Sequence, residues 1–114
     1  MQIASRELQG STILDVSGDI DLAHSPAMRK ALLGEIRDKQ TPKVFLNLIN
    51  VRYIDSSGIA SLVEGLKASR DKGSRLILYG LSKTVREVME LSRLQKIFEI
   101  YDNEEQALAA EVRK

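Results

Sequence analysis

Hydrophobic and polar positions change their spacing several times along the 114-residue chain, and each change predicts a new element of secondary structure. Segments 3–7 and 12–17 flank a turn that contains Gly10, which is typical of a β-hairpin. The nearly continuous apolar run at 44–48 predicts a strand that is covered on both faces or central in its sheet. Two later apolar segments predict further strands, at 75–80 and 96–102.

Two other segments have the spacing of amphipathic helices. Ser25 and Pro26 are typical of a helix cap followed by proline at the first helical position, and the apolar residues after them predict a helix over about 26–38. A second helix is expected from about Ile59 to near Gly73. Its apolar residues recur at i, i+3, i+4 and i+7, namely Ile59, Leu62, Val63 and Leu66.

The last third of the chain predicts two more helices. Val85, Val88 and Met89 lie on one stripe of the segment 82–92, and Asn103 can cap a final helix over 103–114. Strands that alternate with helices after an initial hairpin predict an α/β domain with a mixed sheet. Because a chain of this length buries a single core, we expect one domain that covers residues 1–114.

Composition narrows the classes of partner and of compartment. The 17 Lys and Arg residues nearly cancel the 16 Asp and Glu residues, and the two signs are interleaved. This argues against electrostatic capture of nucleic acid or of an anionic membrane. There is no cysteine, which excludes disulfides, thiolate chemistry and cysteine-based zinc sites. With neither a signal-like start nor an apolar run of about 18 residues, a soluble cytoplasmic protein is expected.

The stretch "YIDSSGIA" at 53–60 is the first candidate for a functional site. The connection between the expected buried strand and the next helix consists of Asp55, Ser56, Ser57 and Gly58. Such strand-to-helix connections often carry the functional residues of α/β proteins. The aspartate or one hydroxyl can accept a hydrogen bond from the first helical turn, and glycine permits close approach of another backbone. Capping explains only one of the three polar residues.

Catalysis and metal binding find little support in the residue pattern. A Ser-His-Asp arrangement would need His24, the only histidine, but that residue is expected in the loop before the first helix, and neither serine has the Gly-x-Ser-x-Gly spacing. Asp19 and Asp21 share a face if their segment is extended, yet no third ligand lies nearby, so no metal is expected. No glycine-rich phosphate-binding motif is present, and no cofactor is expected.

A phosphorylated aspartate is a further alternative. Asp55 ends a strand about halfway along the chain, as in response-regulator receivers, which also carry a late lysine. The order of elements differs, because this chain begins with a hairpin and Lys83 precedes the last expected strand.

The remaining alternative is a serine that accepts phosphate from another protein. A phosphate adds about −1.5 to −2 charges, which a helix N-terminus tolerates because its amides and dipole favour anions. A partner that docks on the same surface would meet this dianion at a large cost in affinity. The second hydroxyl can therefore act as a switch for binding while the fold persists.

Three segments, "GDIDLAHSPAMRKAL", "VFLNLINVRYIDSSGIASLVEGLKASRDKGSRLILYGLS" and "VREVMELSRLQKIFEIYDNEEQAL", closely resemble the STAS domains of bacterial anti-sigma factor antagonists. The resemblance covers almost the whole chain in order, and "YIDSSGI" is typical of the group. It implies a STAS-like α/β fold, with a mixed sheet of four or five strands and about four helices packed mainly on one face.

The resemblance also implies a non-enzymatic binding function. In the family, the unphosphorylated antagonist binds an anti-sigma factor that is itself a serine kinase, and a sigma factor is released. Phosphorylation breaks the complex, and a PP2C-type phosphatase restores the unmodified form. Carried over to this chain, the phosphorylated residue is Ser57, with Ser56 as the alternative. The implied partner surface comprises Asp19, Asp21, Asp55, Ser56, Ser57 and Gly58.

Two residues depart from the family pattern. Asn47 stands where many members have aspartate, and Arg93 stands where glycine is common. An alternative within the STAS group is a subunit that docks on the ATPase of a lipid-trafficking ABC transporter, where the same surface needs no switch. An enzyme, chiefly a hydrolase, is the third hypothesis.

Overall fold

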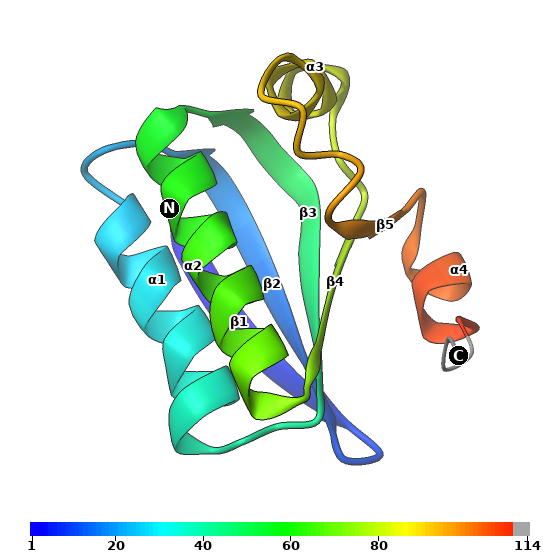
Figure 1. Ribbon diagram of the computed structural model, residues 1–114. Coiled ribbons are helices and arrows are strands. Elements are labelled where there is room, and N and C mark those ends of the chain that lie inside the picture. Colours follow the sequence, from blue (N-terminus) through cyan, green and yellow to red (C-terminus); the bar gives the residue numbers. More distant parts are fainter. Residues whose placement is uncertain (111–114) are drawn as a thin grey trace.

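The computed structural model describes residues 1–110 of the chain. The elements follow one another in the alternating order that the sequence predicts (Figure 1). They are β1 (Gln2–Leu8), β2 (Ser11–Ile20), α1 (Ser25–Leu33), the π-helical η1 (Gly34–Asp38), β3 (Lys43–Ile54), α2 (Ser56–Lys72), β4 (Arg75–Tyr79), α3 (Lys83–Leu91), β5 (Glu99–Tyr101) and α4 (Glu104–Leu108).

The strands form one mixed sheet in the order β1-β2-β3-β4-β5. The hairpin strands β1 and β2 are antiparallel, and every later neighbour is parallel. Figure 1 shows α1 and α2 side by side over one face of this sheet, whereas α4 lies on the other side. The expected α/β class, the mixed sheet and the placement of the helices mainly on one face are confirmed.

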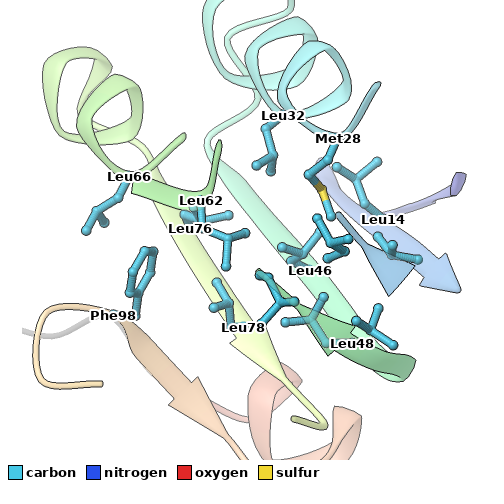
Figure 2. Close-up of a cluster of buried hydrophobic side chains, with 14 of the residues drawn as sticks. Leu14, Met28, Leu32, Leu46, Leu48, Leu62, Leu66, Leu76, Leu78 and Phe98 are labelled. Carbon is cyan, nitrogen blue, oxygen red and sulfur yellow. The ribbon is translucent and has the colours of Figure 1, made fainter. Parts of the chain in front are cut away.

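The main core lies between the sheet and the pair α1–α2 (Figure 2). Alternate residues of a strand point to opposite faces, so one set of strand side chains, including Leu14, Leu46 and Leu76, points toward the helices. Met28 of α1 and Leu62 of α2 meet them and are fully buried. Burial of such side chains contributes about 1.5–3 kcal/mol each, which makes this layer the main source of stability.

The other face of the sheet explains the continuous apolar run of β3. Val44 and Leu46 face the helices, while Phe45 between them belongs to a second buried cluster with Tyr79 and with Ala107 of α4. Because β3 is the middle strand and both of its faces are covered, it has no solvent side at this point. The sequence predicted a strand that is either covered on both faces or central, and β3 is both.

The first helical segment ends at Asp38 as predicted, but its cap and its helix type differ from the prediction. His24, without a side-chain capping bond, is the N-cap, and Ser25 is the first helical residue, so the assignment of Ser25 as the cap was wrong. The cause is Asp21, whose carbonyl oxygen accepts from the amides of His24 and Ser25 at 3.1 and 2.8 Å and starts the helix earlier. The expected helix 26–38 is divided into α1 and the π-helical η1.

Two strands differ in length from the prediction. β3 continues to Ile54, because it still pairs with β2 after its apolar run has ended. The segment 96–102 yields only β5, since Ile97 and Phe98 donate their amides to the carbonyl oxygen of Leu94 and so belong to a turn. Backbone pairing, which hydrophobic spacing does not report, decides both lengths.

The final helix is shorter than expected. Asn103 caps α4 as predicted, with its side-chain oxygen 2.9 Å from the amide of Gln106. The helix ends at Leu108, not at 114, and the part of the prediction that falls on 111–114 lies outside the described residues.

Candidate functional site

The motif Asp55-Ser56-Ser57-Gly58 connects β3 to α2, as the sequence predicts. Asp55 is the N-cap, with an extended backbone at φ −106° and ψ −173°. Its Oδ1 atom accepts from the amides of Ser57 and Gly58 at 2.9 and 3.1 Å. The aspartate therefore supplies the cap, and the helix requires neither serine hydroxyl as an acceptor.

The two serines are in different environments. Ser57 is half-buried, and its hydroxyl donates to Oδ1 of Asp55 at 2.5 Å. Ser56 is exposed, and its hydroxyl has no hydrogen-bond partner within residues 1–110. One hydroxyl is thus held in a defined direction, while the other is free to rotate in solvent.

These contacts perturb the charge state of Asp55. The hydroxyl of Ser57 and then the amide of Gly58 hold the pKa of the Asp55 carboxyl below its ordinary value of 3.8, against a smaller opposing effect of desolvation. The carboxyl is therefore ionised at neutral pH, which agrees with its role as an acceptor of all three hydrogen bonds.

Gly58 fixes the start of α2 against the end of β2. A Cβ atom at this position would lie 2.6 Å from the carbonyl oxygen of Ile20 and 2.6 Å from Cγ1 of Ile54. The amide of Asp55 donates to the same Ile20 oxygen at 3.2 Å. The expected close approach of another backbone is confirmed, and the approaching backbone is that of β2.

The contact with Ile20 brings the expected acidic residues beside the motif, because Asp19 and Asp21 flank Ile20. Asp19 lies in β2 and faces the exposed Arg52 of β3, with Oδ1 3.9 Å from Nε. Asp21 follows the strand and turns back, so that its Oδ1 lies 2.6 Å from Nδ1 of His24. The two carboxylates therefore do not share one extended segment. Within residues 1–110, no group of three His, Cys, Asp or Glu side chains is placed to hold a metal ion.

The histidine does not form a catalytic arrangement with the serines. His24 lies in the loop before α1, as expected, and its Nδ1 atom contacts Asp21. In the described part of the chain, no hydrogen bond joins His24 to Ser56 or Ser57, and the hydroxyl of Ser57 donates to a carboxylate instead. A Ser-His pair of the hydrolase type is absent from this arrangement.

Sequence reasoning missed one contact that couples the motif to α1. The hydroxyl of Ser61 lies 3.1 Å from the carbonyl oxygen of Ser25 and 3.2 Å from that of Ser57. The sequence did contain a signal for this contact, because Ser61 is a polar residue on the apolar face of α2, one turn after the motif, and a buried hydroxyl needs a hydrogen-bond partner. Through this residue the first turns of α1 and α2 hold each other in place.

The surroundings of the motif also carry exposed apolar residues. Leu22 is 75% exposed and Tyr53 is 45% exposed, and both directly adjoin the residues that meet at this end of the sheet. The backbone of Leu22 makes the smallest of the contributions that lower the pKa of Asp55, so this loop lies near the carboxylate. The site therefore combines acidic groups, two hydroxyls and accessible apolar surface.

Comparison with known proteins gives consistent matches. The family model of the STAS domain matches residues 2–107. The anti-sigma F factor antagonist of Paenibacillus polymyxa is 31% identical over 108 residues, which cover 95% of this chain and 92% of the relative. The anti-sigma-B factor antagonist of Listeria monocytogenes is 34% identical over 86 residues, covering 75% and 74% of the two chains.

Solved structures share the fold at lower identity. An anti-sigma factor antagonist from Mycobacterium paratuberculosis superposes with a TM-score of 0.84 at 22% identity, over 94% of this chain and 90% of that one. SpoIIAA in its unphosphorylated form gives 0.71 at 17% identity, over 92% of each chain. Bacillus SpoIIAA in its phosphorylated form gives a TM-score of 0.72 at 19% identity, over 94% of this chain and 96% of that one.

No helix within residues 1–110 has the length and apolar character needed to cross a membrane.

Proposed function

Because the chain belongs to the STAS domain family and, within it, to the anti-sigma factor antagonists, we propose that it binds an anti-sigma factor and so releases a sigma factor. The observation that carries the proposal is the division of roles at the motif. Asp55 alone caps α2, which leaves two serine hydroxyls at an exposed junction without a structural duty as acceptors. Such a junction can be modified without loss of the helix.

The binding surface in this proposal is the end of the sheet formed by β2, β3 and the start of α2. Its carboxylates favour a partner with a basic surface, since complementary charge steers association and rejects wrong partners. The exposed Leu22 and Tyr53 offer apolar area in the same region. We call this region the acidic end surface, and it comprises Asp19, Asp21, Leu22, Tyr53, Asp55, Ser56, Ser57 and Gly58.

Regulation by phosphorylation forms the second part of the proposal. The anti-sigma factor acts as a serine kinase with ATP, and Ser57 is the residue that it modifies. The hydroxyl of Ser57 is held at 2.5 Å by a carboxylate, so its oxygen is oriented, whereas that of Ser56 is not. Catalysis of phosphoryl transfer depends on positioning together with electrostatic stabilisation, and the need for positioning favours the oriented oxygen as the acceptor.

A phosphate on Ser57 would stand next to the ionised Asp55 and in the middle of the acidic end surface. It adds about −1.5 to −2 charges at a place where a bound partner excludes water. Complex formation then becomes unfavourable, and a PP2C-type phosphatase restores binding by removing the group. The proposed kinase uses ATP, and sigma factors act in the cytoplasm, so the proposal includes a cytoplasmic location for this protein.

The proposal is tested by pull-down from the native lysate with wild type, Ser57→Ala and Ser57→Asp as baits, followed by identification of the retained proteins. We expect wild type and Ser57→Ala to retain an anti-sigma factor kinase and Ser57→Asp to bind it at least about tenfold more weakly, because like charges at an interface cost several kcal/mol. In the purified pair with ATP, Ser57→Ala is expected to incorporate no phosphate, and Ser56→Ala to remain a substrate.

Lys67→Glu is the matched control, because it adds negative charge at an exposed position of the same helix, away from the motif. It should leave binding unchanged. Equal binding of the kinase by wild type and Ser57→Asp would refute the switch. Retention of a transporter ATPase by every bait would instead favour the alternative of a lipid-trafficking subunit.

A further inference from the structure

The edge strand β1 has unusual exposure. All of its residues except the half-buried Ile3 are exposed, and it pairs on one side only, with β2. The strand at the opposite edge, β5, has three residues, whereas β1 has seven. Short edges are a common protection against pairing with other chains, and β1 lacks this protection.

Three further protective devices, proline, lysine and a β-bulge, are also missing from β1. The strand contains neither proline nor lysine, and its register with β2 runs without a bulge from Gln2 to Leu8. Arg6, which could blunt the edge, is drawn back across the sheet by Asp15 at 2.6 and 2.8 Å and by Glu104 at 2.7 Å. The outer edge of β1 is thus a regular row of backbone groups that is open to another strand.

The helix layer stops short of this edge. A hollow of about 550 Å³ lies between β1 and the segment formed by α1 and η1. In strand-addition complexes, backbone bonds supply affinity while a neighbouring hollow receives alternate side chains of the added strand. The apolar floor of the hollow comprises Ile3, Leu14, Ala27 and Ala31.

A second copy of β1 matches this edge. If two copies pair antiparallel over their full length, Ser5 faces Ser5, Ala4 faces Arg6 and Ile3 faces Glu7. Ser5 and Ala4 are small, so the strands can approach closely at the centre. Directly opposite residues share a face, and Ser5 lies opposite Leu14 of the helix-side core, which assigns Ile3, Ser5 and Glu7 to the side of the hollow.

Charge supports the same pairing. Lys30 lines the hollow together with Ile3, is exposed, and forms no ion pair within residues 1–110. Lys39, the other lysine of the hollow, is held by Glu35 at 3.0 Å. In the paired strands, Glu7 of the second copy lies opposite Ile3 and therefore on the same side of the sheet as Lys30, where the two opposite charges attract each other. The two-fold symmetry of the pair creates this contact twice.

We propose that the protein forms a symmetric homodimer through antiparallel pairing of β1 with β1, which joins the two sheets into one. The inference does not depend on the proposed function. The acidic end surface lies at the ends of β2 and β3 and around the start of α2, so the pairing of the edges leaves it accessible.

Sedimentation equilibrium of the purified chain from micromolar to millimolar concentration tests the proposal. We expect a monomer–dimer equilibrium in wild type. Glu7→Lys and Lys30→Glu should each raise the dimer Kd about tenfold, because two attractive contacts become repulsive, and the double variant Glu7→Lys/Lys30→Glu should restore it. Ser5→Lys, which brings two ammonium groups together at the centre, should abolish the dimer.

Thermal unfolding followed by circular dichroism verifies that each variant is folded, and Lys67→Glu on α2 controls for a change of net charge. A monomer at every concentration would overturn the proposal. So would a dimer that is indifferent to Ser5→Lys, or a double variant that stays as weak as the single ones, because both results locate self-association elsewhere. Capture of only a foreign strand-bearing protein by this edge would overturn it too.

Discussion

A single carboxylate oxygen organises the candidate site at the scale of residues. Oδ1 of Asp55 receives the amides of Ser57 and Gly58 and the hydroxyl of Ser57. This concentration of donors holds the carboxyl in its charged form and orients one of the two serines. The presence of two adjacent hydroxyls is therefore not explained by capping, since the cap is neither of them.

Arg93, which stands where glycine is common in the family pattern, lies in a strained part of the backbone. It follows α3 with a φ of +57°, in the left-handed region that disfavours side chains. The amide of Arg93 donates to the carbonyl oxygen of Glu90 and that of Leu94 to Met89, both at 3.0 Å, a pattern that closes a helix where glycine is preferred. The glycine common in the family fits this backbone without strain.

We therefore predict that Arg93→Gly stabilises the protein by about 0.5–1 kcal/mol, because relief of the left-handed strain exceeds the entropy cost of glycine. Urea unfolding of the purified variant measures the change. Glu87→Gly, an exposed position inside α3, is the control and should lose about 1 kcal/mol. A loss of stability in Arg93→Gly similar to that of the control would contradict the explanation.

Close contact between a helix start and a strand end positions the site at the scale of elements. Gly58 lets α2 begin directly against the carbonyl oxygen of Ile20, and Ser61 links the first turns of α2 and α1. The motif and the end of β2, which carries Asp19, are thereby one rigid unit.

Gly58→Ala is expected to destabilise the protein by about 1–3 kcal/mol, because the added methyl group meets backbone that cannot yield easily. It should also weaken anti-sigma factor binding by displacing the motif from the end of β2. Gly34→Ala is a matched control, since no atom lies within 4 Å of its Cβ position and its φ is −60°. That variant should be as stable as wild type or more so. Equal unfolding midpoints for both alanine variants would show that the contact is unimportant.

At the scale of the whole molecule, ion pairs and hydrogen bonds of charged side chains connect elements in addition to the hydrophobic layers. On the second face of the sheet, Arg6 bridges Asp15 and Glu104, and the hydroxyl of Tyr79 donates to Glu104 at 2.5 Å. This network fastens α4 over the cluster that contains Phe45 and Ala107. The buried Glu35 accepts from Thr41 at 2.9 Å and from Lys39, which holds η1 to the loop that leads into β3.

These contacts predict the direction of acid denaturation. Hydrogen bonds from Arg6 lower the pKa values of Asp15 and Glu104, and the hydroxyl of Ser57 lowers that of Asp55. For Glu35, burial is the largest single influence and raises the pKa, but the hydrogen bonds from Lys39 and two threonines together outweigh it and lower the pKa. A carboxyl whose folded pKa is depressed adds stability above its ordinary value, and the contribution disappears as pH falls through the folded pKa. Stability should therefore be near its plateau at pH 7 and fall progressively below the ordinary values of 3.8 and 4.5.

Urea midpoints between pH 7 and pH 2 measure this dependence. Glu104→Gln should lose less free energy of unfolding on acidification than wild type, because the variant lacks one of the carboxylates whose protonation destabilises the fold. Glu87→Gln is a control, because Glu87 forms no ion pair within residues 1–110. A pH profile of Glu104→Gln that is parallel to that of wild type would contradict the assignment.

Local chemistry determined much of this protein from its sequence alone. The i, i+3, i+4, i+7 spacing after the motif produced α2, the asparagine at 103 capped α4, and the apolar run at 44–48 produced a central strand. The strand-to-helix position of Asp55, Ser56, Ser57 and Gly58 was readable for the same reason. Periodicity, capping and burial are encoded by neighbours in the chain, so sequence exposes them.

Only the tertiary structure decided which polar group caps, how long β3 and β5 are, and where charges meet. The approach of Ile20 to Gly58, the left-handed backbone of Arg93 and the exposed edge of β1 depend on segments far apart in the sequence or on pairing that leaves no local signal. Backbone hydrogen bonds and ion pairs between distant segments are satisfied by position in space, and the order of residues does not specify that position by itself.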